Sequence, residues 1–427
     1  MSRSKLETLK TIFTSEYWLI ASLCGAFFSF FALNRGGVVV FIDACFVFLL
    51  INFLSGTYRP KDIPLGFWAM IAICGYLLVV SVLFHPMDSH FGWMGYMVRM
   101  LVIAFAIHCL SLKKYNNWMA ILLFAMMSLA VCWQSVAYYF FKMPYGTFSN
   151  VHYLSSFAIL VLPGIVYSFL STRSWYRYLF IVVALLDIGL ILKVPSRPAV
   201  LGITVGVFFV LIFLTKGRRR WGGLLVLCAA LSGVLITNYG DLYTRFEELI
   251  VTLPREERIE IWSDSWTLLK ENSLMTWIFG NGIGVFRTVY PKLFTPVPGG
   301  TINFPHFHGL EILYDSGVIA VFLVFSGITS LLIYAIKAAK QADNAKIRML
   351  VICLIVAFIG WLIHTGFTLP FYSKYSQYSL AFILGTLLSI IEYPADRKDK
   401  KTNPKIFPDC RYSENSHFTA VVKKAFR

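Results

Sequence analysis

Long apolar stretches dominate this chain, and each is about 18–22 residues long, enough to cross the ~30 Å hydrocarbon core of a bilayer as one helix. Only 14% of the 427 residues are charged, whereas soluble domains contain roughly 25% charged residues. The strands of membrane β-barrels alternate apolar and polar residues over ~10 positions. The stretches in this chain are continuously apolar, so a membrane β-barrel is excluded. Twelve stretches can be counted, with centres near Ala26, Phe46, Ile73, Val102, Met126, Leu160, Val183, Val207, Ala229, Phe325, Val356 and Ile383. The sequence therefore predicts an all-α polytopic membrane protein, a bundle of about twelve transmembrane helices.

The positions of Lys and Arg in the short connecting segments predict the orientation of the spans. If the N-terminus is cytoplasmic, the connections on that side carry 17 Lys and Arg and the opposite short loops carry 5. We therefore expect both termini in the cytoplasm. The net charge of +16 then reflects topology and an attraction to anionic membrane lipid, so we expect no nucleic-acid partner. Seven of the eight cysteines lie in apolar stretches, which predicts neither a disulfide nor a Cys-x-x-Cys metal site.

One exterior connection is far longer than the others, which is typical of a functional loop. We divide the chain into residues 1–238 with nine spans, residues 239–313 forming this loop, residues 314–392 with three spans, and residues 393–427 as a basic cytoplasmic tail.

The long loop contains a predicted amphipathic helix. In the stretch REERIEIWSDSWTLLKE, Ile259, Trp262, Trp266 and Leu269 recur at helical spacing opposite charged residues, a pattern that indicates a helix lying on the membrane surface. The stretch FGNGIGVF follows it with three glycines in five residues. This glycine stretch lacks the Lys-Ser/Thr of a phosphate-binding P-loop.

The start of the eighth span has the features of an anion site. Ser196 can cap a helix and Pro198 suits its first turn, which places Arg197 at a helix N-terminus with its partial positive charge and unpaired N–H groups. A guanidinium can bind phosphate oxygens through two hydrogen bonds. The alternative is that Arg197 anchors the helix at the lipid headgroups.

Five ionisable residues lie within the predicted spans, where such residues are costly and often functional. They are Asp43, Arg99, His108, Asp187 and His364. Their partners are not evident from the sequence, so structural pairing and a functional role both stay open.

His306 and His308 stand where the long loop meets the tenth span, and three interpretations are open. They can be interfacial polar residues. They can bind a metal with Glu311 or Asp315, although further ligands are not evident. One of them can be a general base, because an imidazole pKa near 6.5 suits proton transfer at neutral pH.

The chain resembles the O-antigen ligase family of membrane glycosyltransferases in three stretches. SRPAVLGI resembles the family's Ser/Thr-Arg segment at the start of a span, and RIEIWSDSWTLLKENSLMTWIFGNGIGVF resembles its Arg-x-x-x-Trp helix and Gly-x-Gly turn. HFHGLEILYDSGVIA resembles the His-Asn…Leu…Gly pattern that ends the loop, with Ala320 in place of the last glycine. The spacing to Gly317 favours His306 as the family histidine, with Phe307 in the place of the Asn.

The resemblance implies a fold like that of C-type membrane glycosyltransferases in the inner membrane of a Gram-negative bacterium, with the long loop in the periplasm. It implies transfer of a polysaccharide from undecaprenyl diphosphate to lipid A–core in lipopolysaccharide biosynthesis, inverting and without metal or cofactor. Arg197 and Arg258 would hold the diphosphate, His306 would activate the acceptor hydroxyl, and His308 would orient or replace it. The alternatives are an O-antigen polymerase, with a lipid-linked repeat unit as acceptor, and a membrane transporter or flippase.

Overall fold

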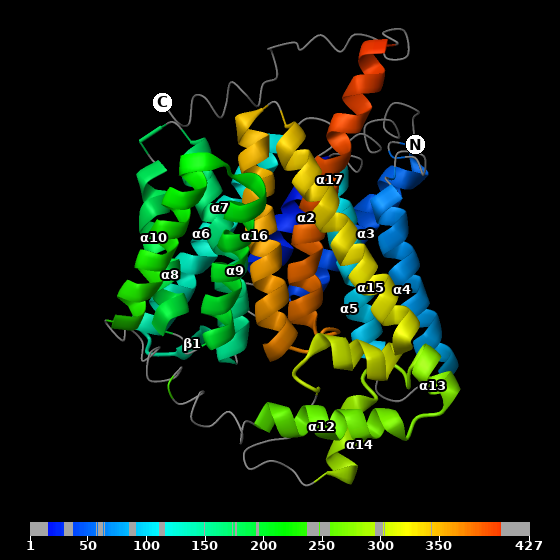
Figure 1. The fold of residues 1–427 in the computed structure, drawn as a ribbon. Helices are drawn as coiled ribbons and strands as arrows, with labels where there is room; N and C mark the ends of the chain where they lie inside the picture. The colour runs from blue at the N-terminus through cyan, green and yellow to red at the C-terminus, as the bar shows by residue number, and fades with distance from the viewer. Residues whose placement is uncertain are drawn as a thin grey trace. The chain divides into compact units, whose positions relative to one another are not determined.

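The structure is a computed structural model that describes residues 16–402 apart from 30–36, 57, 59–62, 64, 85–90, 111–115, 149, 173, 176, 194–195, 237–246, 248–256, 295–301, 303 and 343. The described part is helical apart from short connections and the four-residue strand β1 (Pro144–Thr147) (Figure 1). The helices that contain the predicted span centres are α2 (Glu16–Phe28), α3 (Gly37–Leu54), α4 (Leu65–Phe84), α5 (Phe91–Leu110), α6 (Asn116–Tyr139), α7 (Val151–Ser171), α8 (Arg177–Lys193), α9 (Arg197–Leu214), α10 (Gly217–Ile236), α15 (His308–Gln341), α16 (Ala345–Thr368) and α17 (Lys374–Thr402).

The fold is that of a helical membrane protein. In the described part of the chain, seven helices are long and apolar enough to cross a membrane. They are Gly37–Leu54, Leu65–Leu83, Gly92–Leu110, Val151–Ser171, Arg197–Leu214, His308–Gln341 and Ala345–Thr368. Each of the twelve predicted centres lies within a helix of its own, although α2 and α8 have only 13 and 17 residues.

The chain divides into two units, residues 1–391 and residues 392–427. In the second unit, the structure describes the helical residues 392–402 at the end of α17. All further description concerns the first unit.

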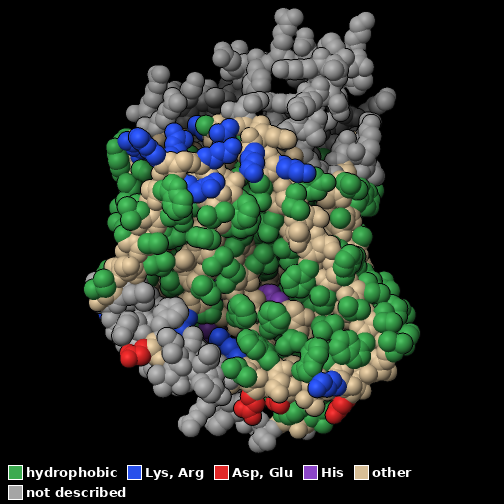
Figure 2. Space-filling model, in the orientation of Figure 1, with side chains coloured by type: hydrophobic (Ala, Val, Ile, Leu, Met, Phe, Trp, Pro, Cys, Tyr) green, Lys and Arg blue, Asp and Glu red, His purple; other side chains and the backbone are tan. Residues whose placement is uncertain are grey.

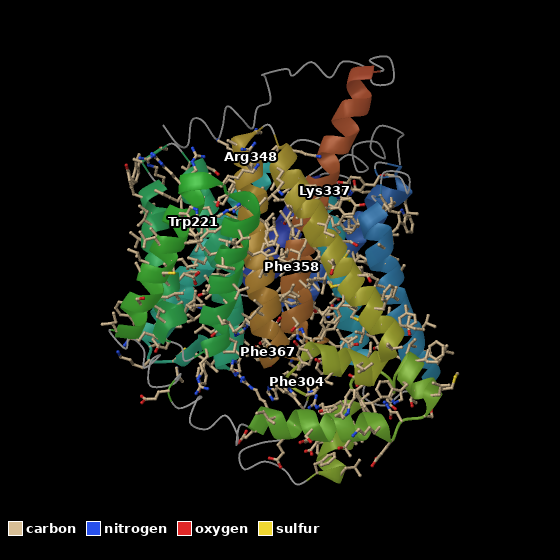
Figure 3. The ribbon with its side chains drawn as sticks, viewed as in Figure 1. Trp221, Phe304, Lys337, Arg348, Phe358 and Phe367 are labelled. Atoms are coloured by element: carbon tan, nitrogen blue, oxygen red, sulfur yellow. The ribbon has the colours of Figure 1, made fainter. Side chains whose placement is uncertain are left out.

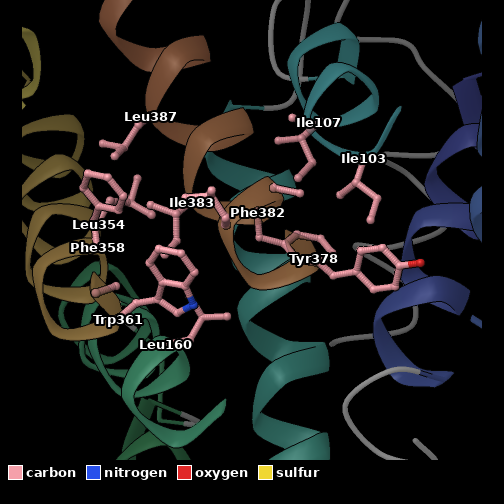
Figure 4. Close-up of a cluster of buried hydrophobic side chains, with 14 of the residues drawn as sticks. Ile103, Ile107, Leu160, Leu354, Phe358, Trp361, Tyr378, Phe382, Ile383 and Leu387 are labelled. Carbon is pink, nitrogen blue, oxygen red and sulfur yellow. The ribbon is translucent and has the colours of Figure 1, made fainter. Parts of the chain in front are cut away.

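α7 and α16 lie at the centre of the bundle. Burial covers 78% of the apolar window of α7 and 67% of that of α16, compared with 22% for α9. Trp361 and Phe358 of α16 face Ile383 and Leu387 of α17, with Leu160 of α7 beside them (Figure 4). These fully or nearly fully buried side chains belong to the largest apolar cluster among the described residues.

α9 approaches α16 closely because both helices have glycine at the crossing. A Cβ built on Gly202 would lie 2.5 Å from the carbonyl oxygen of Gly360, and one built on Gly206 would lie 2.8 Å from that of Val356. A Cβ on Gly360 would in turn meet the Ile159 side chain of α7 at 2.8 Å. Small residues at such positions let membrane helices pack at short distance. This packing fixes the ends of α7, α9 and α16 relative to one another.

The connection between α10 and α15 contains three further helices at one end of the bundle. They are α12 (Glu257–Lys270), α13 (Leu274–Phe279) and α14 (Phe286–Leu293), and α12 lies across the end of the bundle (Figure 1). On the predicted apolar face of α12, Leu269 is buried by other parts of the protein, whereas Ile259 and Trp266 are 43% and 45% exposed. Its buried residues are Ile261, Ser265, Leu268 and Leu269. Of these, Ile261, Leu268 and Leu269 pack with residues of α14 and α15.

α15 begins earlier than the tenth span was predicted to begin, at His308 instead of residue 314, and it consists of two parts. Gly317 has a left-handed backbone (φ 78°) that interrupts the helix. Glycine is required there for a second reason, since a Cβ would lie 2.2 Å from the carbonyl oxygen of Ile278. The first part of α15 therefore belongs to the end of the bundle that carries α12–α14.

The two ends of the bundle differ in charge. Lys and Arg side chains gather at the end that carries Lys337 and Arg348 (Figures 2 and 3). Acidic side chains gather at the opposite end, where Phe304 and Phe367 lie next to α12 (Figures 2 and 3). The asymmetry follows the distribution of basic residues between alternate connections in the sequence.

Candidate catalytic site

Three helix ends meet beside α12 and place two histidines next to each other. His152 is the second residue of α7, Ser196 immediately precedes α9, and His364 lies in the last turns of α16. Nε2 of His364 lies 3.2 Å from Oγ of Ser196, and the ring centroids of His152 and His364 are 6.2 Å apart. His364 and Ser196 are both buried. The close packing of α9 on α16 explains why residues so distant in sequence lie together.

α9 begins at Arg197 as predicted, but Ser196 does not cap it with its side chain. Ser196 occupies the N-cap position without a side-chain capping hydrogen bond, since its hydroxyl lies at hydrogen-bond distance from His364. Arg197 is half-buried at the first position of the helix. Arg197 therefore lies at the N-terminus of α9, directly after Ser196 of the Ser196–His364 pair.

The start of α7 has a different cap. The side chain of Asn150 accepts a hydrogen bond of 2.8 Å from the backbone N–H of His152. This cap fixes the backbone from which the His152 imidazole projects. Nδ1 of His152 is buried and has no hydrogen-bond partner among the described residues.

His306 lies in the short segment before α15 and has a left-handed backbone (φ 52°), which is unusual for a residue other than glycine. The indole Nε1 of Trp262 donates a hydrogen bond of 2.9 Å to the carbonyl of the preceding residue, Pro305. The ring of the following residue, Phe307, stacks on Phe367 with centroids 5.8 Å apart. Phe304 and Phe367 lie on the same side of the bundle, facing α12 (Figure 3). Contacts on both sides thus hold His306.

The surroundings of His306 keep its imidazole neutral at physiological pH. Burial lowers the pKa of His306 from 6.5 to about 4, and the positive charge of Arg258 and the nearby His152 lower it further in the same direction, while a hydrogen bond with the Phe367 backbone opposes them. Nδ1 of His306 is buried and has no hydrogen-bond partner among the described residues. A neutral imidazole whose Nδ1 has no partner among the described residues can accept a proton from a substrate hydroxyl. A pKa of about 4 makes it a weaker base than the pKa near 6.5 on which the expectation of a general base rested.

His308 differs from His306 in its partners. Its Nε2 lies 2.8 Å from the carbonyl oxygen of Leu369, and its side chain is buried. Its ring lies 5.3 Å from that of Phe371 and 6.4 Å from that of Trp361. Since Leu369 ends α16 and His308 starts α15, this hydrogen bond joins two helix ends.

Glu311 and Asp315, the possible metal ligands of the sequence, bind backbone N–H groups instead. The carboxylate of Glu311 accepts a hydrogen bond of 2.7 Å from Phe371 N–H. That of Asp315 accepts hydrogen bonds from the N–H groups of Gly284 and Phe286, at 2.8 Å and 3.3 Å. In the described part of the chain, no three His, Cys, Asp or Glu residues come together in a group that could hold a metal ion.

The glycine stretch Phe279–Phe286 packs against the break in α15. A Cβ on Gly280 would lie 2.4 Å from the carbonyl oxygen of Asp315, and the backbone N–H of Gly282 donates to that carbonyl at 2.8 Å. The glycines therefore permit two backbone segments to touch. Together with the Asp315 carboxylate, they fix the start of α15 and hence the segment that carries His306.

Arg258 and His306 are the two predicted site residues that the structure brings together. Arg258 lies one helical turn before Trp262 on α12, and its charge acts on both His306 and His152. Arg197 lies next to the same group through Ser196 and His364. His152 was not predicted, because a single histidine after Asn150 carries no signal before its neighbours are known.

The other ionisable residues of the spans have structural partners or lie away from this group. Nε of Arg99 lies 3.3 Å from the Asp43 carboxylate, which joins α3 to α5. Nδ1 of His108 lies 3.2 Å from Oγ of Ser389. Asp187 of α8 is fully buried, and its carboxylate has no hydrogen-bond partner among the described residues.

The arrangement combines a neutral imidazole with two arginines and a helix N-terminus at one end of a membrane bundle. Histidine is visible in a hollow between hydrophobic side chains near that end (Figure 2). Such a group can bind an anion and remove a proton from a neighbouring hydroxyl. No family model and no curated protein sequence matches the chain.

Proposed function

We propose that this chain is a membrane glycosyltransferase of the O-antigen ligase type. It transfers a polysaccharide from undecaprenyl diphosphate to a sugar hydroxyl of lipid A–core during lipopolysaccharide biosynthesis. The observation that carries the proposal is the proximity of the Arg258 charge to His306, whose imidazole is neutral and whose Nδ1 has no hydrogen-bond partner among the described residues. Such a reaction requires a base that removes the proton of the acceptor hydroxyl and a cation that stabilises the negative charge of the departing diphosphate.

In the proposed reaction, Nδ1 of His306 accepts the proton of the acceptor hydroxyl as its oxygen attacks the anomeric carbon of the donor. The bond between this carbon and the diphosphate oxygen breaks, and the configuration inverts because attack comes from the opposite face. Both electrons of that bond leave with the lipid diphosphate. Arg258 and Arg197 neutralise the leaving group, so the reaction proceeds without a metal ion or cofactor.

His308 contributes by position in this proposal. Its hydrogen bond with the Leu369 carbonyl uses the ring nitrogen Nε2, and its side chain is only 7% exposed. His308 therefore holds the start of α15 against the end of α16. His306 is the base.

The proposed topology has twelve spans in the bacterial inner membrane with both termini in the cytoplasm. The support is the charge asymmetry of the bundle, since basic residues are enriched in cytoplasmic connections. Lys337 and Arg348 mark the basic end (Figure 3). In this proposed topology the site, which lies at the other end of the bundle, is on the periplasmic face, where the lipid-linked donor and lipid A–core would meet.

The test is the lipopolysaccharide of a strain that lacks this gene, complemented with the wild type or with His306→Gln, Arg258→Gln or Arg197→Gln. We expect the deletion to lose all capped chains and to accumulate lipid-linked polymer, and the three variants to fail to restore them at normal protein level. Full restoration by all three variants would contradict the site. Core bearing a single repeat unit would instead identify a polymerase, and substrate counterflow in vesicles without glycan transfer would identify a transporter.

A further inference from the structure

Trp262 links the helix that carries Arg258 to the segment that carries His306. Its indole Nε1 donates a 2.9 Å hydrogen bond to the carbonyl of Pro305, the residue directly before His306. Its ring lies 6.1 Å from that of Phe307, the residue directly after His306. One side chain therefore contacts the chain on both sides of the proposed base.

The backbone at His306 needs such support. A left-handed conformation is unfavourable for histidine, because its Cβ approaches the following carbonyl oxygen. Residues in such conformations persist where the surrounding structure holds them. Here the restraints include the hydrogen bond of the His306 imidazole with the Phe367 backbone, the Trp262 hydrogen bond to Pro305 and the stacking of Phe307 on Phe367. Trp262 also approaches Phe367, at 6.4 Å.

Trp262 also determines where Arg258 lies. The two residues are four apart on α12, so they share one face of the helix. Because Trp262 fixes that face to Pro305, Arg258 is held close enough for its charge to act on His306.

We propose that Trp262 is a positioning residue: its indole N–H, bonded to the Pro305 carbonyl, holds His306 in its left-handed conformation and at a fixed distance from Arg258. The catalytic part of this inference rests on the proposed glycosyl transfer, whereas the structural part does not. Trp262 need not touch either substrate, since it acts through His306.

The first measurement compares Trp262→Phe with Trp266→Phe in a membrane assay of glycan transfer to lipid A–core. The phenyl ring that Trp262→Phe introduces would keep most of the packing but would lack the N–H donor. We expect kcat to fall about 10- to 100-fold with KM for the donor changed by less than about threefold, because misplacing a reacting group by ~1 Å costs about that much in rate. Trp266 is the matched control, since it lies on the same helix and is half-exposed.

A double-mutant cycle separates positioning from general damage. If Trp262 acts through His306, Trp262→Phe should change the residual rate of His306→Gln by less than about twofold, because coupled residues are not additive. Two independent losses that multiply in the double variant would overturn the proposal.

The second measurement does not depend on activity. Diethyl pyrocarbonate modifies neutral imidazoles, and mass spectrometry of the purified full-length protein at pH 7.5 reports the rate at each histidine. We expect His306 to react at least about threefold faster in Trp262→Phe than in the wild type, and His308, bonded to the Leu369 carbonyl, to keep its rate as an internal reference. Equal rates at His306 in the two proteins would overturn the positioning role.

The two measurements together distinguish the possible failures. Faster modification of His306 in a protein whose wild type transfers no glycan would refute the proposed function and leave the structural part of the inference standing. Faster modification with unchanged kcat would show that the hydrogen bond serves the fold alone, and would overturn the catalytic part.

Discussion

Gly202 of α9 lies against Gly360 of α16 with no room for a side chain, because a Cβ on Gly202 would be 2.5 Å from the Gly360 carbonyl oxygen and 3.3 Å from its Cα. Ser196 and His364, which lie 3.2 Å apart, belong to these same two helices. The geometry at the site therefore depends on a crossing between helices deeper in the bundle.

Gly202→Ala is expected to destabilise the protein. The added methyl group would meet backbone atoms instead of a mobile side chain, and overpacking of this kind costs about 1–3 kcal/mol. Thermal unfolding of the purified protein in detergent measures the effect. Gly75→Ala in α4 is the matched control, since a Cβ there meets nothing within 4 Å and alanine favours a helix over glycine by ~0.5–1 kcal/mol. Equal stability of the two variants would contradict the close packing of α9 on α16.

Substitutions of His306 and His308 are expected to have different effects. His306→Gln should lower the rate of glycan transfer by about 10²–10⁴, with unfolding temperature close to that of the wild type. His308→Ala should lower stability, because it leaves the buried Leu369 carbonyl without its partner at a cost of about 1–3 kcal/mol. The measurements are the transfer rate and the unfolding temperature of each purified variant. A stable His308→Ala protein that has lost transfer, beside an active His306→Gln protein, would reverse the assignment of the base.

The two histidines also show what the sequence can predict at this site. Their residue types and their place at the end of the long loop predicted titratable groups at a membrane boundary. The spacing to Gly317 favoured His306 as the family histidine, but it could not show which partners each imidazole has. The two imidazoles differ because of residues that are distant in the sequence. The Leu369 carbonyl is a hydrogen-bond partner of His308, whereas Trp262 and Phe367 contact the residues on either side of His306.

The helical architecture was easier to predict than the contacts. Continuous apolar stretches predict helices from local sequence alone, and every predicted span centre lies in a helix. Pairings between helices depend on shape: the ion pair of Asp43 with Arg99 and the contact of Gly202 with Gly360 require the three-dimensional arrangement. The exposed side chains of Ile259 and Trp266 show the same limit, because helical periodicity fixes which residues share a face but not which face is covered.

The pH dependence of transfer should reflect the lowered pKa of His306. With a folded-state pKa of about 4, His306 is neutral and competent as a base at pH 7, and the rate should fall only as the pH drops through about 4. An ordinary histidine would lose activity near pH 6.5. Arg258→Gln removes one cause of the lowered pKa, so the acidic limb of its residual rate, measured with purified protein, should move to higher pH. A limb that stays in place would show that Arg258 does not act on His306.

The same pKa also gives the sign of its contribution to stability. The unfolded chain binds a proton at His306 near pH 6.5 but the folded chain does so only near pH 4. Stability from this group is therefore complete above about pH 6.5 and decreases as the pH falls towards 4. His306→Gln should show a weaker loss of stability over that interval in pH-dependent unfolding.

His152→Ala is expected to weaken binding of the donor diphosphate more than it slows the chemical step. Nδ1 of His152 is buried without a partner among the described residues, and its ring lies 6.2 Å from that of His364. The charge of Arg258 acts on it as well, so a diphosphate held by Arg258 would lie within reach of this imidazole. A hydrogen bond to a charged group contributes about 1.5–3 kcal/mol, which corresponds to an increase of about 10- to 100-fold in KM for the lipid-linked donor. His152→Asn keeps a short polar side chain and should recover part of the loss, and unfolding temperatures serve as the control for folding. If His152→Ala instead lowers kcat and leaves KM unchanged, His152 serves the proton transfer at His306, not the anion.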